Sequence, residues 1–179
     1  MKELRYKNKL SMKNRMMRLL WGVTYRMFFV LSPPWILNNW RVFLLKLFGA
    51  KVGVGCKIDP SIKVWAPWNL IIGDYVALGE KVNLYSVDRI EIGSKVAISD
   101  GSFICTASHD ISSLVRPLTH SPIYIEDHCW IASQAMLHPG ITIKEGSIVA
   151  ARSVIRKSTN SWEIWAGNPG TMVGNRIIK

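Results

Sequence analysis

Cysteine is scarce in this chain. Cys56, Cys105 and Cys129 are the whole complement, an odd number at wide spacing. No two of them form a CxxC pair, so the sequence argues against a zinc knuckle and against a disulfide framework. We expect three ordinary buried or half-buried thiols in a protein of a reducing compartment.

Long uncharged runs are also missing, since no stretch reaches the roughly 20 residues that a membrane-spanning helix needs. Arg18 and Arg26 interrupt the apolar segment near the N-terminus, and no small-residue cleavage site follows it. The sequence therefore predicts neither a signal peptide nor a spanning helix, and we expect a cytoplasmic location.

Acidic residues are nearly absent from residues 1–51. This arm holds 11 of the 23 lysines and arginines but only one of the 12 acidic residues, Glu3, whereas the rest of the chain is almost neutral. A partner that responds to the excess positive charge would therefore meet the arm. The basic residues come with no nucleic-acid-binding motif, so we expect no nucleic-acid partner.

The arm itself has a helical pattern. An amphipathic helix is predicted from Met16 to Leu31, because apolar residues recur at three- and four-residue steps at Met16, Leu19, Leu20, Val23, Met27 and Val30. Ser32-Pro33-Pro34 must end this helix. A second helix is predicted from Ile36 to Phe48, with Gly49 as its stop.

Two interpretations of the arm stay open. In the first, both helices only pack on the neighbouring domain and cover its open end. In the second, the arm also contacts an anionic membrane at the inner face, with Trp21, Phe28, Phe29, Trp35 and Trp40 in the interface and the basic residues beside them.

The rest of the chain is dominated by a six-residue repeat between Ile58 and Ile155. A period of six fits neither an amphipathic helix nor simple strand alternation, and is typical of a parallel β-helix. Aliphatic residues mark it, with two-residue slips before Ile72 and Ile92, at Ile58, Val64, Leu70, Ile72, Leu78, Leu84, Ile90, Ile92, Ile98, Ile104, Ile125, Ile131, Leu137, Ile143, Val149 and Ile155.

Three such repeats make one triangular coil, so we expect roughly four to five coils. The position after the aliphatic residue is often glycine or another small residue, as at Gly73, Gly79 and Ala132, and we expect the corners there. The repeat disappears between Thr106 and Pro122. A β-helix tolerates insertions at its corners, so this segment is predicted to be a projecting loop on the binding face.

Four stretches of the chain resemble the hexapeptide-repeat acyltransferases: Arg41–Ala50, Trp65–Leu70, Ile104–Asp110 and Ala166–Pro169. The most specific features are the His-Asp pair before the loop, Trp130-Ile131 after it, and Ala-Gly-Asn-Pro near the end. Within this superfamily the chain is most similar to the maltose and galactoside acetyltransferases and to the colanic acid biosynthesis type.

The resemblance implies an all-β solenoid, a left-handed parallel β-helix, although parallel crossovers are normally right-handed. It divides the chain into a helical cap (1–51), an acyltransferase domain (52–170) with the loop 106–122, and a short tail or helix (171–179). It further implies a homotrimer with active sites between subunits. The activity implied is acetyl transfer from acetyl-CoA to a hydroxyl of a sugar, or of a lipid-linked sugar, in exopolysaccharide or capsule biosynthesis, with no metal.

The family's general base corresponds to His109, and an imidazole suits that role near neutral pH. Asp110 either holds the imidazole tautomer or caps the loop, and both roles stay open. Asn83 matches the family asparagine that contacts the acceptor or the developing oxyanion. For coenzyme A, the resemblance implies Trp130, Ala132, Ser133, Ala150 and Ala151 along the slot, with Arg156 and Lys157 at the nucleotide phosphates.

Three other functions remain as alternatives. One is a carbonic anhydrase of the γ type, which the spacing of His109, His120, His128 and His138 disfavours because no two of them are five positions apart. Another is a non-catalytic scaffold or membrane adaptor with the same solenoid. The third is an acyltransferase that acts on a small acceptor such as serine.

Overall fold

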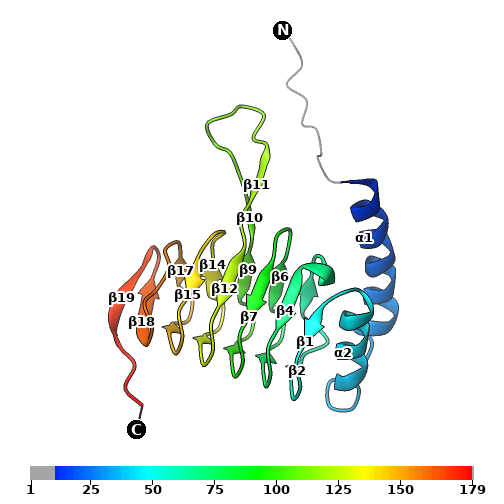
Figure 1. The fold of residues 1–179 in the computed structure, drawn as a ribbon, viewed down its shortest axis with the longest axis horizontal. Helices are drawn as coiled ribbons and strands as arrows, with labels where there is room; N and C mark the ends of the chain where they lie inside the picture. Colours follow the sequence, from blue (N-terminus) through cyan, green and yellow to red (C-terminus); the bar gives the residue numbers. More distant parts are fainter. Residues whose placement is uncertain (1–10, 179) are drawn as a thin grey trace.

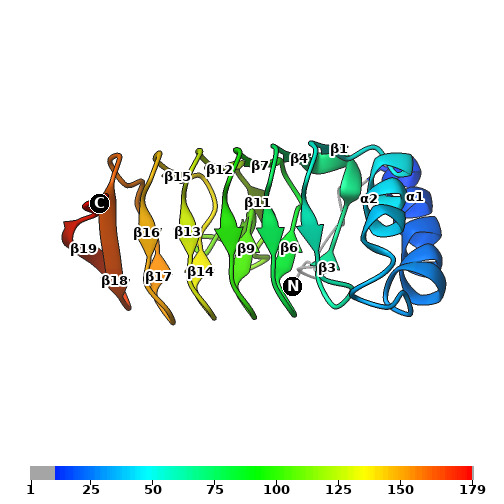
Figure 2. The same cartoon turned by 90° about the horizontal axis from the view of Figure 1, so that it is seen from below.

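The computed structural model describes residues 11–178 and shows a parallel β-helix with a helical cap at its N-terminal end (Figures 1 and 2). Three sheets form the sides of the solenoid. Face A contains β1 (Lys51–Val52), β4 (Leu70–Ile72), β7 (Ile90–Ile92), β12 (Ile123–Ile125) and β15 (Thr142–Ile143).

The other two faces follow in every coil. Face B contains β2 (Lys57–Ile58), β5 (Ala77–Leu78), β8 (Ala97–Ile98), β13 (Trp130–Ile131), β16 (Ile148–Val149), β18 (Glu163–Gly167) and β19 (Gly170–Asn175). Face C contains β3 (Lys63–Val64), β6 (Asn83–Tyr85), β9 (Phe103–Cys105), β14 (Met136–Leu137) and β17 (Val154–Ile155). The aliphatic residues of the repeat point inward and form one continuous core, which confirms the predicted solenoid.

The slips in the repeat have a structural cause. Strands β4 and β7 have three residues, and both ends of each strand are buried, so Leu70 and Ile72 point inward on the same strand. Each slip lies where the chain passes from face C to face A, and a 3₁₀ turn at Pro67–Asn69 (η2) occupies that corner in the first coil. The irregular lengths of the coils are therefore concentrated at one corner, the C/A corner.

The corners differ from our expectation in one respect. Positive φ does not fall directly after the inward aliphatic residue but three positions after it, for example at Tyr75 (56°), which follows Ile72, and Lys81 (56°), which follows Leu78. Gly73 is needed for space instead, because a Cβ there would lie 2.7 Å from the carbonyl carbon of Gly93 in the next coil. Stacking of the coils, and not backbone conformation, selects glycine at that position.

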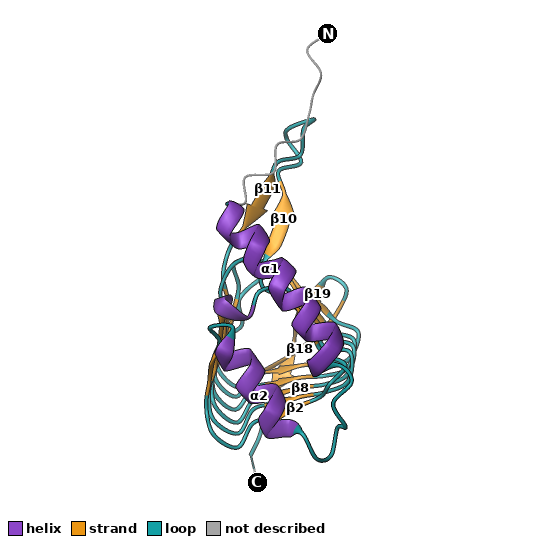
Figure 3. Ribbon diagram, turned by 90° about the vertical axis from the view of Figure 1, so that its right-hand side faces the viewer, coloured by secondary structure: helices purple, strands orange, loops and turns teal. Residues whose placement is uncertain are grey.

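The predicted loop is an antiparallel hairpin. Strands β10 (Ala107–His109) and β11 (Leu118–His120) pair with each other and project from the C/A corner of the third coil. In a triangular solenoid that corner lies opposite face B. Figure 3, seen along the solenoid, shows the hairpin on the side away from β2, β8 and β18.

The cap consists of α1 (Met12–Thr24), a π-helical turn η1 (Tyr25–Phe29) and α2 (Asn38–Leu47), which lie across the open end of the first coil (Figure 3). Their side chains pair with main-chain groups of that coil. The Trp21 indole N–H donates to the Val64 carbonyl (2.8 Å), and the Tyr25 hydroxyl donates to that of Ile62 (3.0 Å). Main-chain carbonyls at the open edge of the first coil thereby receive hydrogen bonds from side chains of the cap.

Helix α2 adds two further pairings. The Asn38 amide donates to the Cys56 carbonyl (2.8 Å) and accepts from the Ile58 amide (2.9 Å). Arg41 is 1% exposed, and its Nε donates to the Ile58 carbonyl at 2.7 Å. Its two terminal nitrogens donate to the Pro33 and Pro34 carbonyls, at 2.9 and 2.7 Å, so Arg41 ties the interhelical loop to the first coil.

One expectation about the cap is wrong. Trp21 and Phe29 do not lie at the surface; they are 3% and 0% exposed and belong to the core. Phe28, Trp35 and Trp40 are exposed as predicted. The apolar residues whose spacing predicts the helix face solvent: Met16, Leu19, Leu20, Val23, Met27 and Val30.

The C-terminal end is closed by backbone pairing. Strand β18 pairs with β16 on face B, and β19 folds back antiparallel to β18, so residues 170–175 form a strand and not a helix. All three cysteines are buried, as expected, and burial raises the pKa of the Cys129 thiol to about 12. Among residues 11–178, no helix has the length and apolarity required to cross a bilayer.

Candidate active site

His109 stands at the end of β10, on the projecting hairpin, with its side chain exposed. Its Nδ1 lies 2.7 Å from the Arg116 carbonyl oxygen, across the turn of the hairpin. A carbonyl can only accept, so Nδ1 carries a proton, and in the neutral imidazole Nε2 is left with its lone pair. This is the tautomer that a general base requires.

Asp110 follows directly, but its contacts are with the loop. Its Oδ1 accepts from the Ser112 amide (2.9 Å) and from the Ser112 hydroxyl (2.6 Å). These hydrogen bonds hold the pKa of the Asp110 carboxyl below its usual value. Of its two expected roles the structure favours capping of the loop, because the Arg116 carbonyl is what orients the imidazole.

Sequence reasoning missed the pairing of His120 with Asp88. His120 Nδ1 lies 2.7 Å from Asp88 Oδ2 at the base of the hairpin. Burial raises the pKa of the Asp88 carboxyl, but the hydrogen bonds from His120 and the Arg89 amide outweigh it, and the pKa is lowered overall. His120 lies opposite Ala107 and His109 opposite Leu118, so both histidines project from the same side of the hairpin.

Asn83 lies on face C, one coil nearer the cap than the strand that leads into the hairpin. In the sheet it stands between Lys63 on β3 and Phe103 on β9. Trp65, Tyr85 and Phe103 form a row of rings on this face, with successive centroids 6.0 and 6.1 Å apart. The repeat gives no hint of this row, because Trp65 and Tyr85 follow an inward residue whereas Phe103 precedes one.

Most of the residues expected at coenzyme A lie on another side of the solenoid. Trp130 projects from face B and donates from Nε1 to the Ser99 hydroxyl (2.9 Å). The corner with Ala132 and Ser133 stacks directly on the corner with Ala150 and Ala151, since the Arg152 amide donates to the Ser133 carbonyl (2.9 Å). These five expected residues are therefore brought together along face B and the B/C corner.

Arg156 and Lys157 follow β17 and so lie at the C/A corner, on the hairpin's side of the solenoid. Both are exposed. His138 lies one coil earlier; burial lowers its pKa, and the charge of Arg156 lowers it further. Arg176, on the segment that follows β19, donates to the His128 and Gly146 carbonyls at 2.7 and 2.9 Å.

The predicted site residues thus fall into two groups within one chain. The first group, on face C and the C/A corner, contains Asn83, His109, Asp110, Arg156 and Lys157. The second, on face B and the B/C corner, contains Trp130, Ala132, Ser133, Ala150 and Ala151. Because the C/A corner lies opposite face B, the solenoid itself separates His109 from Trp130.

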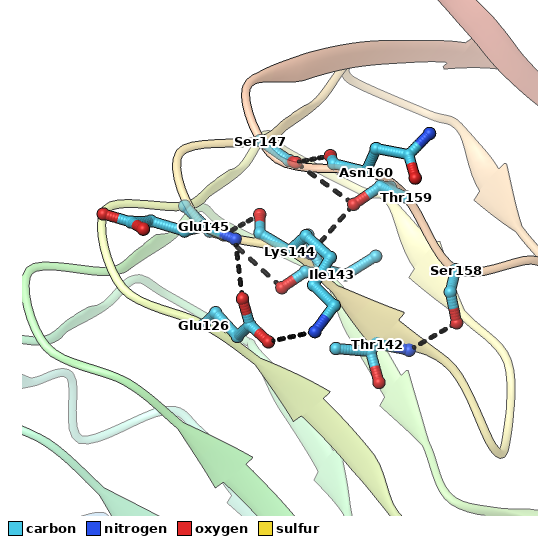
Figure 4. Close-up of polar contacts among 10 residues, drawn as sticks. Glu126, Thr142, Ile143, Lys144, Glu145, Ser147, Ser158, Thr159 and Asn160 are labelled. Atoms are coloured by element: carbon cyan, nitrogen blue, oxygen red, sulfur yellow. Dashed lines mark hydrogen bonds and ion pairs between the residues drawn. The ribbon is translucent and has the colours of Figure 1, made fainter.

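A separate cleft of about 620 Å³ lies along face A. Figure 4 shows the polar contacts at its C-terminal end, where Glu126 accepts from Lys144 Nζ (2.6 Å) and from the Glu145 amide (3.0 Å). The Lys144 hydrogen bond lowers the pKa of the Glu126 carboxyl. None of the predicted site residues lines this cleft, and its contacts join adjacent coils.

The chain matches a family model described as "Bacterial transferase hexapeptide (six repeats)" over residues 122–157. Over 158 residues it is 41% identical to WcaF of Escherichia coli strain K12, a protein named as a colanic acid biosynthesis acetyltransferase. The match covers 88% of this chain and 86% of that relative.

Solved structures share the fold. A hexapeptide-repeat acetyltransferase of Vibrio cholerae, solved with acetyl coenzyme A, superposes with a TM-score of 0.86 at 21% identity and covers 97% of this chain and 94% of its own. A galactoside acetyltransferase solved with coenzyme A gives 0.85 at 22% identity, over 94% and 84% of the two chains. These likenesses confirm the left-handed parallel β-helix.

Proposed function

The chain belongs to the hexapeptide-repeat acetyltransferases, and from that premise we propose that it transfers the acetyl group of acetyl-CoA to a sugar hydroxyl in exopolysaccharide or capsule assembly. The proposal is supported by the 41% identity to a protein named for colanic acid biosynthesis. The single observation that carries the chemistry is the tautomer of His109, whose Nδ1 is held by a main-chain carbonyl.

In the proposed reaction, Nε2 of His109 removes the proton of the acceptor hydroxyl as the oxygen attacks the thioester carbonyl. The tetrahedral intermediate then expels the thiolate of coenzyme A, and the imidazolium returns the proton to that sulfur. The Arg116 carbonyl stabilises the imidazolium through the Nδ1 hydrogen bond. Asn83 is the candidate to contact the acceptor or the oxyanion, and general-base catalysis of this type contributes typically about 10²–10⁴-fold.

We infer further that the site forms between subunits of a homotrimer. The two groups of residues lie on different sides of one solenoid, so a complete site needs the first group from one copy and the second from its neighbour. In that arrangement Trp130 and the small corners would border the pantetheine arm. Arg156 and Lys157 of the adjacent copy would meet the phosphates.

The acceptor follows from the same premise. A sugar carried on a lipid would place the enzyme at the inner face of the cytoplasmic membrane, in agreement with the basic, apolar cap. Soluble sugars, nucleotide sugars and serine are the acceptors to compare. A scaffold without activity would neither bind acetyl-CoA nor consume it.

The first experiment is turnover of acetyl-CoA against that acceptor panel. His109→Ala should lower turnover about 10²–10⁴-fold without weakening the thermal shift that acetyl-CoA produces. His128→Asn is a matched control, because His128 lies at a corner with φ of 60° and asparagine tolerates that conformation. Undiminished turnover in His109→Ala would refute the general-base assignment.

The second experiment tests the shared site by complementation. His109→Ala and Trp130→Ala, each weakly active alone, should recover activity when co-expressed, because some interfaces of a mixed trimer carry both native groups. His109→Ala with Asn83→Ala is the matched pair that should not recover, since both changes damage the first group. Recovery by both pairs, or by neither, would contradict a site divided in this way.

A further inference from the structure

The cap has an outer surface that its closing role leaves unexplained. Trp21, Tyr25 and Phe29 recur every four residues on the inner side of α1 and η1. Trp21 and Tyr25 donate to carbonyls of the first coil, and Phe29 packs edge-on against Trp21. The opposite side carries a second apolar stripe, exposed to solvent, in which Leu19 is 68% exposed. We call this stripe the outer face; its residues on α1 and η1 are Met12, Met16, Leu19, Leu20, Val23 and Met27.

Helix α2 continues the outer face. It buries Arg41, Leu44 and Leu45 against the first coil, so Trp40, Phe43 and Leu47 on its other side also point away from the solenoid. Trp40 stacks on Phe43 with centroids 5.6 Å apart, and its Nε1 donates to the Phe28 carbonyl (3.0 Å), which joins the two parts of the surface. The loop between the helices adds Trp35, 81% exposed.

The charges around this surface are of one sign. Between Glu3 and Asp59 the sequence contains no acidic residue. Lys13, Arg26 and Lys46 are exposed on the two helical segments. A protein partner of ordinary composition would require acidic counterparts at particular positions, whereas an anionic bilayer accepts apolar side chains and basic side chains anywhere in its interface.

A basic cleft lies between the cap and the first coil. It has a volume of about 310 Å³ and is lined by Arg18 and Arg26 from the cap and by Lys63 and Trp65 from the first coil. The Arg18 guanidinium lies 3.9 Å from the centroid of the Trp65 ring, which orients its charge without neutralising it. Cations of this kind, with no carboxylate among the lining residues, suit a phosphate group.

We propose that the outer face of the cap is a docking surface for an anionic lipid bilayer, with the basic cleft taking lipid phosphate groups. This deepens the proposed function and rests on it only for the acceptor, which would be carried in the same bilayer. Docked in this way, the solenoid stands upright on the membrane and the hairpin with His109 projects parallel to the surface (Figure 1). The hairpin leaves the third coil, two strand spacings or roughly 10 Å beyond the first.

This orientation is also compatible with the proposed trimer. The cap occupies one end of the solenoid, so the three faces and the C/A corner remain free for contacts between copies. Three solenoids with parallel axes would present three caps to one plane, and their binding would reinforce one another.

The test is binding of the full chain to vesicles of phosphatidylcholine, with and without phosphatidylglycerol, followed by sedimentation. We expect binding to the anionic vesicles that weakens as salt is raised. The triple variant Leu19→Gln, Leu20→Gln, Trp35→Gln should weaken it more than about tenfold. Arg26→Gln with Lys46→Gln should weaken it about fivefold for each charge removed.

The matched control is at the far end of the solenoid, where Val173→Gln with Ile177→Gln removes exposed apolar residues and should leave vesicle binding unchanged. Thermal unfolding must show that every variant is folded. Failure of the native chain to bind anionic vesicles, or equal loss in the control, would overturn the proposal. A second result would also overturn it: the native chain does not bind vesicles, and the triple variant has a different oligomeric state from the native chain. The outer face would then be a contact between copies.

Acetyl transfer to a soluble acceptor separates this proposal from the proposed function. The triple variant should keep the native rate in that assay. Vesicle binding without turnover would leave the docking surface standing and refute the enzyme assignment. Turnover without vesicle binding would leave the enzyme assignment standing and refute the docking surface.

Discussion

The two ends of the solenoid are closed by different chemistry. At the C-terminal end, β18 and β19 extend face B by main-chain hydrogen bonds. At the N-terminal end, side chains of Trp21, Asn38 and Arg41 pair with main-chain groups of the first coil. A helical cap that closes the end in this way uses only its inner side, so the composition of its outer side is free to vary. The apolar outer face is therefore a property that closure does not demand.

The largest effect should come from the inner side of α1. Trp21→Ala removes a ring that packs against Tyr25, Phe29 and Phe48 and a hydrogen bond to the first coil. We expect a loss of about 3–5 kcal/mol in the free energy of unfolding, measured by chemical denaturation at fixed protein concentration. Leu20→Ala, one residue away on the outer face, should stay within about 0.5 kcal/mol. Equal losses would mean that the outer face is also packed.

The second comparison sets two arginines against each other. Arg41→Met leaves the buried Ile58 carbonyl, and the partly buried carbonyls of Pro33 and Pro34, without their donor, and we expect a loss of about 3 kcal/mol. Arg176→Met, at the other end, removes two hydrogen bonds that are only partly buried, those to the His128 and Gly146 carbonyls, so about 1 kcal/mol is expected. A larger loss for Arg176 in the same denaturation experiment would reverse the comparison.

The third comparison contrasts the stacked coils with the C-terminal hairpin. Gly73→Ala places a methyl group 2.7 Å from the backbone of the next coil, whereas a Cβ at Gly174 meets nothing within 4 Å. We expect a loss of about 1–3 kcal/mol for the first change and less than about 0.5 kcal/mol for the second. If Gly73→Ala proved neutral, the coils would have to separate more easily than their stacking suggests.

The sequence predicted the solenoid well because its inner positions are under a single constraint. Ile58, Leu78 and Ile98 occupy the same place in successive coils, so one period describes the core. A projecting loop was also predictable, since Thr106–Pro122 is where that period fails, but its pairing into a hairpin was not. The helical pattern of the cap was misleading in a different way. Two stripes, one at Trp21, Tyr25 and Phe29 and one at Leu19 and Val23, are both apolar, and composition cannot say which of them is buried.

The candidate site shows a similar limit. His109 could be selected from the sequence because it stands at the break in the repeat. Its partner could not, because a main-chain carbonyl, that of Arg116, leaves no trace in the residue type. Asp88 and His120 are 32 positions apart, and only the return of the hairpin to the C/A corner brings them together.

The smallest expected effect is a difference between the two ends of the solenoid in their response to acid. Glu163 accepts from the Asn160 amide and side chain and from Trp165 Nε1, and these hydrogen bonds lower the pKa of its carboxyl. Its contribution is therefore present above the unfolded value of about 4.3 and is lost as pH falls through the lowered pKa of the folded state. The groups that close the N-terminal end are neutral, like Trp21 and Asn38, or permanently charged, like Arg41. Below pH 4, hydrogen exchange corrected for intrinsic rates should speed up in β19 before it does in β2. Glu163→Gln should remove that dependence on pH in β19. Simultaneous acceleration at both ends would show that they are not closed independently.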